Sequence, residues 1–297
     1  MNIIESYRSE LLAALMAVPS FKTAWPKLKS SLLSNLPDHH KLTKRDIFDL
    51  GDHLSEAFLS VGGTREQSSV GQAGIVWEGL IAWYLNLCLC GTKAVAIKGR
   101  KHFIPQSVDK ALTVSYQNSS LRTETDILIV YLNKKSLDSS AKYIKKAVEQ
   151  YKNIVDSNIS DINIINLQCK TNWNDIAQIP MLWNLIYSPS FTHNDVTVGI
   201  NGYTLSNFKN FLYAFVTVPT QKKYNFTSTC LPVLRVKTCS GGNYWGKQTL
   251  SNIAFSIKMI FQKNHNCLPA LSSIGNGYSY AIKNNSSDID WKIFSLY

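Results

Sequence analysis

The chain has 297 residues, enough for one large domain or two small ones, and its 45% hydrophobic and 17% charged residues are typical of a globular protein. No apolar run reaches the ~18 residues of a membrane-spanning helix, so no transmembrane helix is expected, and the six cysteines show no Cys-x-x-Cys pair and no zinc-ligand spacing. The net charge of +11 favours a polyanionic partner, most often nucleic acid, with plain surface solubility as the alternative.

The N-terminal residues lack the basic and apolar segments of a signal peptide, so we expect a cytoplasmic, reduced protein with no membrane partner. Residues 1–60 are predicted to be helical and to cap the rest of the fold. Trp25-Pro26 interrupts the pattern and is expected to begin a second helix, and Thr43 is a candidate N-cap with Asp46 three residues on. The alternative role of this region is a dimer interface or a DNA-contacting arm.

Residues 61–72 form a loop rich in glycine and small hydroxyl residues. Arg65, Ser68 and Ser69 are candidate contacts to DNA phosphates. A flexible connector is the equally supported alternative.

Residues 72–85 are apolar nearly all round, which predicts a buried helix in which Glu78 is the only charge. Such a charge is costly unless it is paired or binds a metal. Residues 94–97 form a predicted strand, and the basic turn after it carries Lys98, Arg100 and Lys101. We interpret that turn as facing phosphate, with an exposed hairpin tip as the alternative.

Two apolar runs, at residues 127–131 and 162–170, are predicted to be buried strands with polar ends. Asp126 precedes the first, and the second ends in Gln168, Cys169 and Lys170, of which Gln168 and Lys170 share a face. An amphipathic helix is predicted at residues 136–152 between them, so both parallel and hairpin pairing stay open. As neighbours, the strands would bring a carboxylate, an amide and an ammonium together.

This pattern resembles the PD-(D/E)XK nucleases, which include most type II restriction endonucleases. Thr125-Asp126 stands where that family usually has Pro-Asp, and Gln168-Cys169-Lys170 stands where it has an acid, any residue and lysine. The glutamine departs from the pattern, and the separation of 42 residues (168 − 126) is longer than usual. Glu78 on its apolar helix resembles the family's metal-site glutamate. Gln178 and Leu182 weakly resemble a Gln-x-x-x-Tyr element.

The resemblance implies a single α/β domain over residues 1–297, with a restriction-endonuclease-like mixed central sheet flanked by helices. Residues 1–60 would be the helical N-terminal region, 61–190 the catalytic core and 191–297 a C-terminal extension with possible DNA-recognition elements. The implied activity is Mg²⁺-dependent hydrolysis of double-stranded DNA at a specific short sequence. A homodimer and a cognate DNA methyltransferase as genetic partner would accompany it.

The resemblance also assigns roles to the site residues. Asp126 and Glu78 would bind Mg²⁺, together with the Cys169 backbone carbonyl and the Gln168 amide oxygen. Lys170 would position the attacking water and offset negative charge at the phosphate. Because Gln168 lacks the family's negative charge, Glu78 or Glu124 should compensate for it.

Later segments supply candidate DNA contacts. Residues 196–198 and 230–237 are predicted strands, residues 208–216 are either helix or strand, and residues 250–261 are a predicted helix. The loop 240–247 is the candidate for reading base edges, with a tight turn around a packed tryptophan as the competing interpretation. The candidate DNA-binding residues after the second strand are Asn172, Asn174, Lys237, Asn243 and Lys247.

Two other functions stay open from the sequence. One is a structure-specific DNA nuclease of the resolvase or repair type. The other, motivated by Gln168, is a non-catalytic DNA-binding protein on a degenerate nuclease fold.

Overall fold

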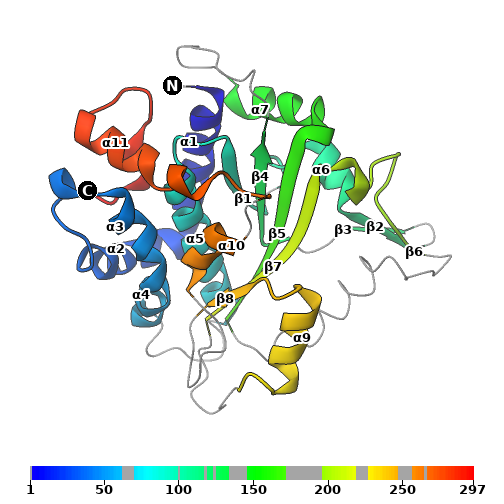
Figure 1. Ribbon diagram of the computed structural model, residues 1–297, viewed down its shortest axis with the longest axis horizontal. Helices are drawn as coiled ribbons and strands as arrows, with labels where there is room; N and C mark the ends of the chain where they lie inside the picture. The colour runs from blue at the N-terminus through cyan, green and yellow to red at the C-terminus, as the bar shows by residue number, and fades with distance from the viewer. Residues whose placement is uncertain are drawn as a thin grey trace.

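The computed structural model describes most of the chain, in ten segments: residues 2–61, 70–99, 101–116, 119–122, 125–133, 146–171, 196–218, 227–246, 256–263 and 266–297. Its architecture is mixed α/β, with a central sheet, N-terminal and C-terminal helices gathered on one side of it and a smaller sheet beyond its other side (Figure 1). Within the described parts of the chain, no helix combines the length and apolarity needed to cross a bilayer.

The central sheet has five strands in the order β1-β4-β5-β7-β8. Neighbours β1/β4 and β4/β5 are antiparallel, whereas β5/β7 and β7/β8 are parallel. The strand that follows Asp126 (β4) and the strand that ends in Lys170 (β5) therefore pair antiparallel, as in the hairpin alternative. The strands are β1 (Ala94–Lys98), β4 (Ile127–Leu132), β5 (Ile162–Lys170), β7 (Asn210–Thr217) and β8 (Tyr244–Gly246).

The smaller sheet is antiparallel, with β2 (Thr113–Tyr116) between β3 (Ser119–Arg122) and β6 (Val196–Val198). Helix α6 (Gln106–Ala111) runs directly into β2. Its first turn is held by Asp156, which accepts hydrogen bonds from the backbone N–H and the hydroxyl of Ser107.

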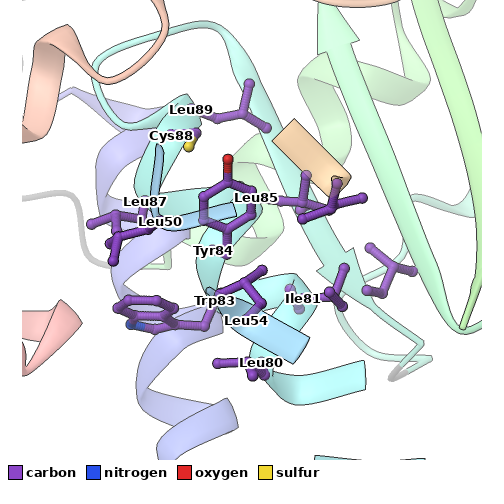
Figure 2. Close-up of a cluster of buried hydrophobic side chains, with 14 of the residues drawn as sticks. Leu50, Leu54, Leu80, Ile81, Trp83, Tyr84, Leu85, Leu87, Cys88 and Leu89 are labelled. Atoms are coloured by element: carbon purple, nitrogen blue, oxygen red, sulfur yellow. The ribbon is translucent and has the colours of Figure 1, made fainter. Parts of the chain in front are cut away.

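Helix α5 (Val70–Leu89) packs its apolar surface against one face of the central sheet, as its composition predicts. The sheet residues it meets alternate along their strands, as a pleated strand requires. Figure 2 shows how Leu80, Ile81 and Tyr84 of α5 meet Leu50 and Leu54 from the N-terminal region. This helix therefore links the sheet to the N-terminal helices.

The N-terminal region is helical, as predicted, with α1 (Ile3–Met16), α2 (Pro19–Leu33), α3 (Lys44–Asp49) and α4 (Leu54–Val61). Thr43 and Asp46 form the capping box of α3. The prediction that Trp25-Pro26 begins a helix is wrong, because α2 begins at Pro19 and contains Pro26. A proline in a helix interior costs a backbone hydrogen bond. Trp25, which is 8% exposed, offsets that cost by packing on Phe21 and Trp83.

The opposite face of the sheet is covered by α7 (Ala147–Asp156), α6 and part of α1. Tyr151 of α7 stacks on Tyr7 of α1 with ring centroids 4.0 Å apart. The predicted helix at 136–152 is observed from Ala147 onward, and residues 134–145 lie outside the described residues.

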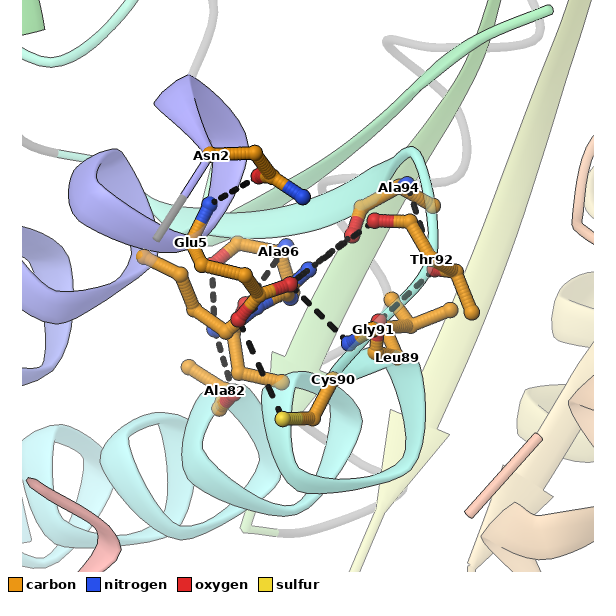
Figure 3. A network of polar contacts seen from close by, with 11 residues as sticks. Asn2, Glu5, Ala82, Leu89, Cys90, Gly91, Thr92, Ala94 and Ala96 are labelled. Carbon is orange, nitrogen blue, oxygen red and sulfur yellow. Dashed lines mark hydrogen bonds and ion pairs between the residues drawn. The ribbon is translucent and has the colours of Figure 1, made fainter. Parts of the chain in front are cut away.

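A buried polar network fixes β1 at the edge of the sheet (Figure 3). The Arg8 guanidinium donates to the Glu5 carboxylate, to Asn86 Oδ1 and to the Ala94 carbonyl. Asn86 in turn accepts from the Ala96 N–H and donates to the Ala96 carbonyl. Side chains thus satisfy the outward backbone groups of an edge strand, which would otherwise be unpaired.

The C-terminal third departs from its predicted elements in two ways. Residues 230–237 are predicted to be a strand but form α9 (Leu231–Cys239), because Pro232 fits a first helical turn and Val233 and Val236 share one buried face. The region after residue 190 also supplies β7 and β8 to the central sheet, so it is part of the core rather than an extension.

The remaining C-terminal elements are short helices packed on the α5 side of the sheet. Of the helix predicted at 250–261, the described part begins at residue 256. The elements are three 3₁₀ turns (Ile257–Met259, Leu271–Ser273 and Trp291–Phe294) and the helices α10 (Ile260–Lys263) and α11 (Asn276–Asn284).

Candidate functional site

Antiparallel pairing of β4 and β5 brings together the polar ends that the sequence singles out. Ile127 pairs with Leu167, so continuing the register by one residue places Asp126 opposite Gln168. The Cys169 backbone N–H donates to Asp126 Oδ2 over 2.7 Å, and Lys170 Nζ lies 3.9 Å from the same oxygen. The predicted neighbourhood of Asp126 and Lys170 is therefore observed.

Glu78 reaches this end of the sheet from α5 and forms an ion pair with Lys98 at the end of β1. Lys98 lies two residues after Ala96 in β1, so its side chain points to the same face of the sheet as those of Ala94 and Ala96, which is the face that α5 covers. The buried charge predicted for the apolar helix is thus paired. All four charged side chains keep partial contact with solvent, with 14–23% of their surface exposed.

Gly99 positions the segment that carries Asp126. Its backbone N–H donates to the Asp126 carbonyl over 3.0 Å, which extends the β1–β4 ladder by one bond. A Cβ at this position would clash with the Thr125 carbonyl oxygen. A glycine is therefore required for the close approach that places the carboxylate at the end of the sheet.

The electrostatics of the cluster favour a proton, or a cation, on Asp126. Burial raises its pKa from an ordinary 3.8 to about 6, the Glu78 carboxylate adds to the rise, and Lys170, the Cys169 N–H and Lys98 oppose it. The Cys169 thiol lies near Asp126 and the same three charged side chains. Burial first, and then the Asp126 and Glu78 carboxylates, raise its pKa well above its usual range. Asp126 and Glu78 are thus close enough to repel each other, which is the situation that a divalent cation relieves.

Gln168 occupies the position where the PD-(D/E)XK pattern has an acid. Its side chain is fully buried, unlike those of Asp126 and Lys170. A carboxylate removed from water at this position would cost far more than a neutral amide. The departure from the pattern therefore has a physical reason in the burial of this residue.

The donor set fits a hard cation that retains several waters. Among the described residues, no group of three or more His, Cys, Asp or Glu side chains forms a metal cluster, so the side chains that offer charge are Glu78 and Asp126. In a strand the N–H and C=O of one residue point to the same side, so the Cys169 carbonyl is also directed toward Asp126. Two carboxylates, a carbonyl and water are ligands that Mg²⁺ accepts.

The structure gives Lys98 a different role from the predicted one. Its ammonium pairs with Glu78 inside the site, so it does not face outward on the basic turn. The sequence contains a signal for this, because Lys98 continues the alternation of a strand whose alternate residues face α5. A second residue that the sequence analysis misses is Thr217, which pairs with Lys170 in β7 and has a buried hydroxyl that no described residue hydrogen-bonds.

Three of the other predicted DNA contacts belong to the described residues. Lys101 and Lys237 are exposed, and the Asn243 amide donates to the Ser240 carbonyl within a turn. The neighbouring Trp245 is buried in the core, in agreement with the competing interpretation of that loop. Several candidates lie outside the described residues, namely Arg65, Ser68, Ser69, Arg100, Glu124, Asn172, Asn174, Gln178, Leu182 and Lys247.

Comparison with models of known protein families, with curated proteins and with solved structures gave no match to this chain. The functional conclusion therefore depends on the residues of the chain itself. The decisive group is Glu78, Lys98, Asp126 and Lys170, which come from α5, β1 and the two central strands.

Proposed function

We propose that this protein is a Mg²⁺-dependent endonuclease of the PD-(D/E)XK type, with a restriction-endonuclease-like fold, that cleaves double-stranded DNA at a short specific sequence. The observation that carries the proposal is the antiparallel β4–β5 pairing, which places Lys170 beside Asp126 while α5 delivers Glu78 to the same end of the sheet. Structural coincidence explains a lone strand-end lysine or a lone buried acid, but it does not readily explain all three together.

The chemistry follows from the charges and their positions. Mg²⁺ held by Asp126, Glu78 and the Cys169 carbonyl would neutralise phosphate oxygens and activate a water molecule. Lys170 adds a positive charge at the place where negative charge grows on the scissile phosphate. Gln168 is buried as a neutral amide, so its position in β5 adds no charge to the cluster. Lys98 balances Glu78, so the four side chains sum to zero charge before a cation or a phosphate enters.

The sequence-specific reading is favoured by the size and charge of the chain. The net charge of +11 supports a polyanionic substrate, and much of the 297-residue chain lies outside the cluster and is available for base recognition. A palindromic target would call for a symmetric homodimer, because two-fold protein symmetry matches two-fold DNA symmetry. A cognate methyltransferase would then protect the host DNA.

The test is cleavage of supercoiled, unmethylated plasmid DNA with Mg²⁺, comparing wild type with Asp126→Ala and Lys170→Ala. The proposal predicts discrete linear fragments from wild type, no cutting by either variant, and DNA binding by both. Cutting only at branched or damaged DNA would favour the structure-specific alternative. Binding without cutting in either Mg²⁺ or Mn²⁺ would favour the non-catalytic alternative, which the neutral Gln168 keeps open.

A further inference from the structure

The acidic residues of the chain are distributed unevenly. Residues 196–287 contain no Asp or Glu, while nine of the 31 Lys and Arg residues lie there. Outside this stretch the remaining 22 basic residues (31 − 9) nearly balance the 20 acidic ones. Most of the net charge of +11 therefore belongs to one continuous part of the C-terminal third, and a polyanion should meet that part first.

Among the described elements of this stretch, helix α9 is the one that exposes two large aliphatic side chains. Val233 and Val236 on its inner face pack on Phe215 of β7. On its outer face, Leu231 is 58% exposed and Leu234 is 40% exposed. Arg235 and Lys237 flank these leucines on the same short helix, with Lys237 exposed and Arg235 half-buried. Around the helix axis, the two exposed leucines lie between Lys237 on one side and Arg235 on the other, and the helix carries no acidic side chain.

The position of α9 relates this surface to the catalytic cluster. Phe215, on which α9 packs, pairs with Gln168, and Thr217 at the end of the same strand pairs with Lys170. Neighbouring strands lie about 4.8 Å apart, so α9 stands on the order of 10 Å from the strand that carries Lys170. Figure 1 shows α9 beside β8 at the end of the sheet where β5 and β7 finish.

We propose that the outer face of α9 docks into a groove of the DNA duplex that the cluster cleaves. This inference rests on the proposed function for the identity of the polyanion. The major groove is about 12 Å wide and admits an α-helix. Arg235 and Lys237 are placed to meet phosphates on its walls, while Leu231 and Leu234 meet apolar groups such as thymine methyls.

A second copy of this chain is the other occupant that an exposed apolar helix face suggests. A symmetric dimer through α9 would bring Arg235 and Lys237 of one copy against the same residues of the other. No acidic residue lies within residues 196–287 to offset that repulsion. The charge pattern therefore favours DNA over self-association at this face.

The experiment measures binding to fluorescent unmethylated DNA as a function of salt, in the Lys170→Ala background so that cleavage plays no part. One variant is Arg235→Ala/Lys237→Ala, and a second is Leu231→Ser/Leu234→Ser. The matched control is Lys283→Ala/Lys292→Ala, which also removes two positive charges, both exposed, one on α11 and one on the final 3₁₀ turn.

We expect the Arg235/Lys237 pair to weaken binding at least about tenfold and to lower the salt slope by about two, since each phosphate contact contributes ~0.9. The leucine pair should weaken binding several-fold with the slope unchanged, because it removes no phosphate contact. The control should change the affinity less than about twofold.

Equal effects of the α9 and control pairs would overturn the inference. So would a leucine pair that alters oligomeric state by light scattering while leaving DNA affinity unchanged, because that result assigns the face to a second copy. The two proposals fail separately. A wild type that cuts DNA with α9 variants that bind normally refutes the docking surface alone, and a wild type that never cuts while α9 variants lose binding refutes the nuclease alone.

Discussion

Replacing the central carboxylate should make the folded protein more stable, even though it abolishes the proposed activity. Asp126 is mostly buried, with 14% of its side chain exposed, and this burial, reinforced by Glu78, raises its pKa from 3.8 to about 6. At ~1.4 kcal/mol per pKa unit, that difference corresponds to about 3 kcal/mol of destabilisation when Asp126 is ionised. Asp126→Asn removes this cost while keeping an acceptor for the Cys169 N–H. The pKa of about 6 already includes the attraction of Lys170, so the substitution should raise the free energy of unfolding by up to about 3 kcal/mol at neutral pH.

The pH dependence has a definite sign. Because the folded state holds the proton more tightly than the unfolded state, the stability of the wild type falls as pH rises from about 4 to about 6 and stays lower above that range. The asparagine variant lacks this loss. Its free energy of unfolding should therefore be close to that of the wild type at pH 4 and should exceed it by the full amount at pH 7.5.

The assay is urea unfolding followed by circular dichroism between pH 4 and pH 8. Asp290→Asn is the matched control, since that carboxylate is exposed and should show no such difference. An Asp126→Asn protein that is less stable than wild type at pH 7.5, or whose advantage does not vary with pH, would refute the electrostatic description of the site.

Three further substitutions probe the surroundings of the cluster. Lys98→Met removes the ion-pair partner of Glu78 and should lower the Mg²⁺ concentration for half-maximal binding about threefold to fivefold, as measured by calorimetry. An unchanged Mg²⁺ concentration would mean that Lys98 does not compete with the cation for Glu78. Gly99→Ala should displace the backbone that carries Asp126 and reduce cleavage more than tenfold with folding largely retained, and full activity would contradict the close approach. Arg8→Met leaves the buried Glu5 carboxylate without its ion-pair partner and should lower the free energy of unfolding in urea by about 3–5 kcal/mol. A decrease of less than about 1 kcal/mol would contradict this expectation.

The elements around the site were largely predictable from the sequence. The apolar runs that became α5, β4 and β5 are long and are bounded by polar residues, so their type and approximate limits follow from hydrophobic pattern alone. The pairing of β4 with β5 was not predictable, because the intervening segment allows parallel and antiparallel arrangements alike. Local pattern does not record which strands become neighbours.

Helix α9 and Lys98 show why the rest could not be predicted. The short apolar run at 230–237 suggests a strand, yet it forms a helix whose Val233 and Val236 pack on Phe215. That contact is distant in sequence and is not visible in the local pattern. Lys98 ends β1 and is followed by a basic segment, so the sequence suggests a phosphate-binding turn. Only the approach of α5 in three dimensions supplies Glu78 as its partner.

The central claim is that Asp126 and Glu78 share one divalent cation beside Lys170. Its most direct measurement is a titration of Mn²⁺ into the protein bound to a short unmethylated duplex, followed by electron paramagnetic resonance, for wild type, Asp126→Asn and Glu78→Gln. We predict saturable binding by wild type, at least about tenfold weaker binding by Glu78→Gln and none by Asp126→Asn. Wild-type protein that binds no Mn²⁺, or an Asp126→Asn variant that binds it equally well, would contradict the account.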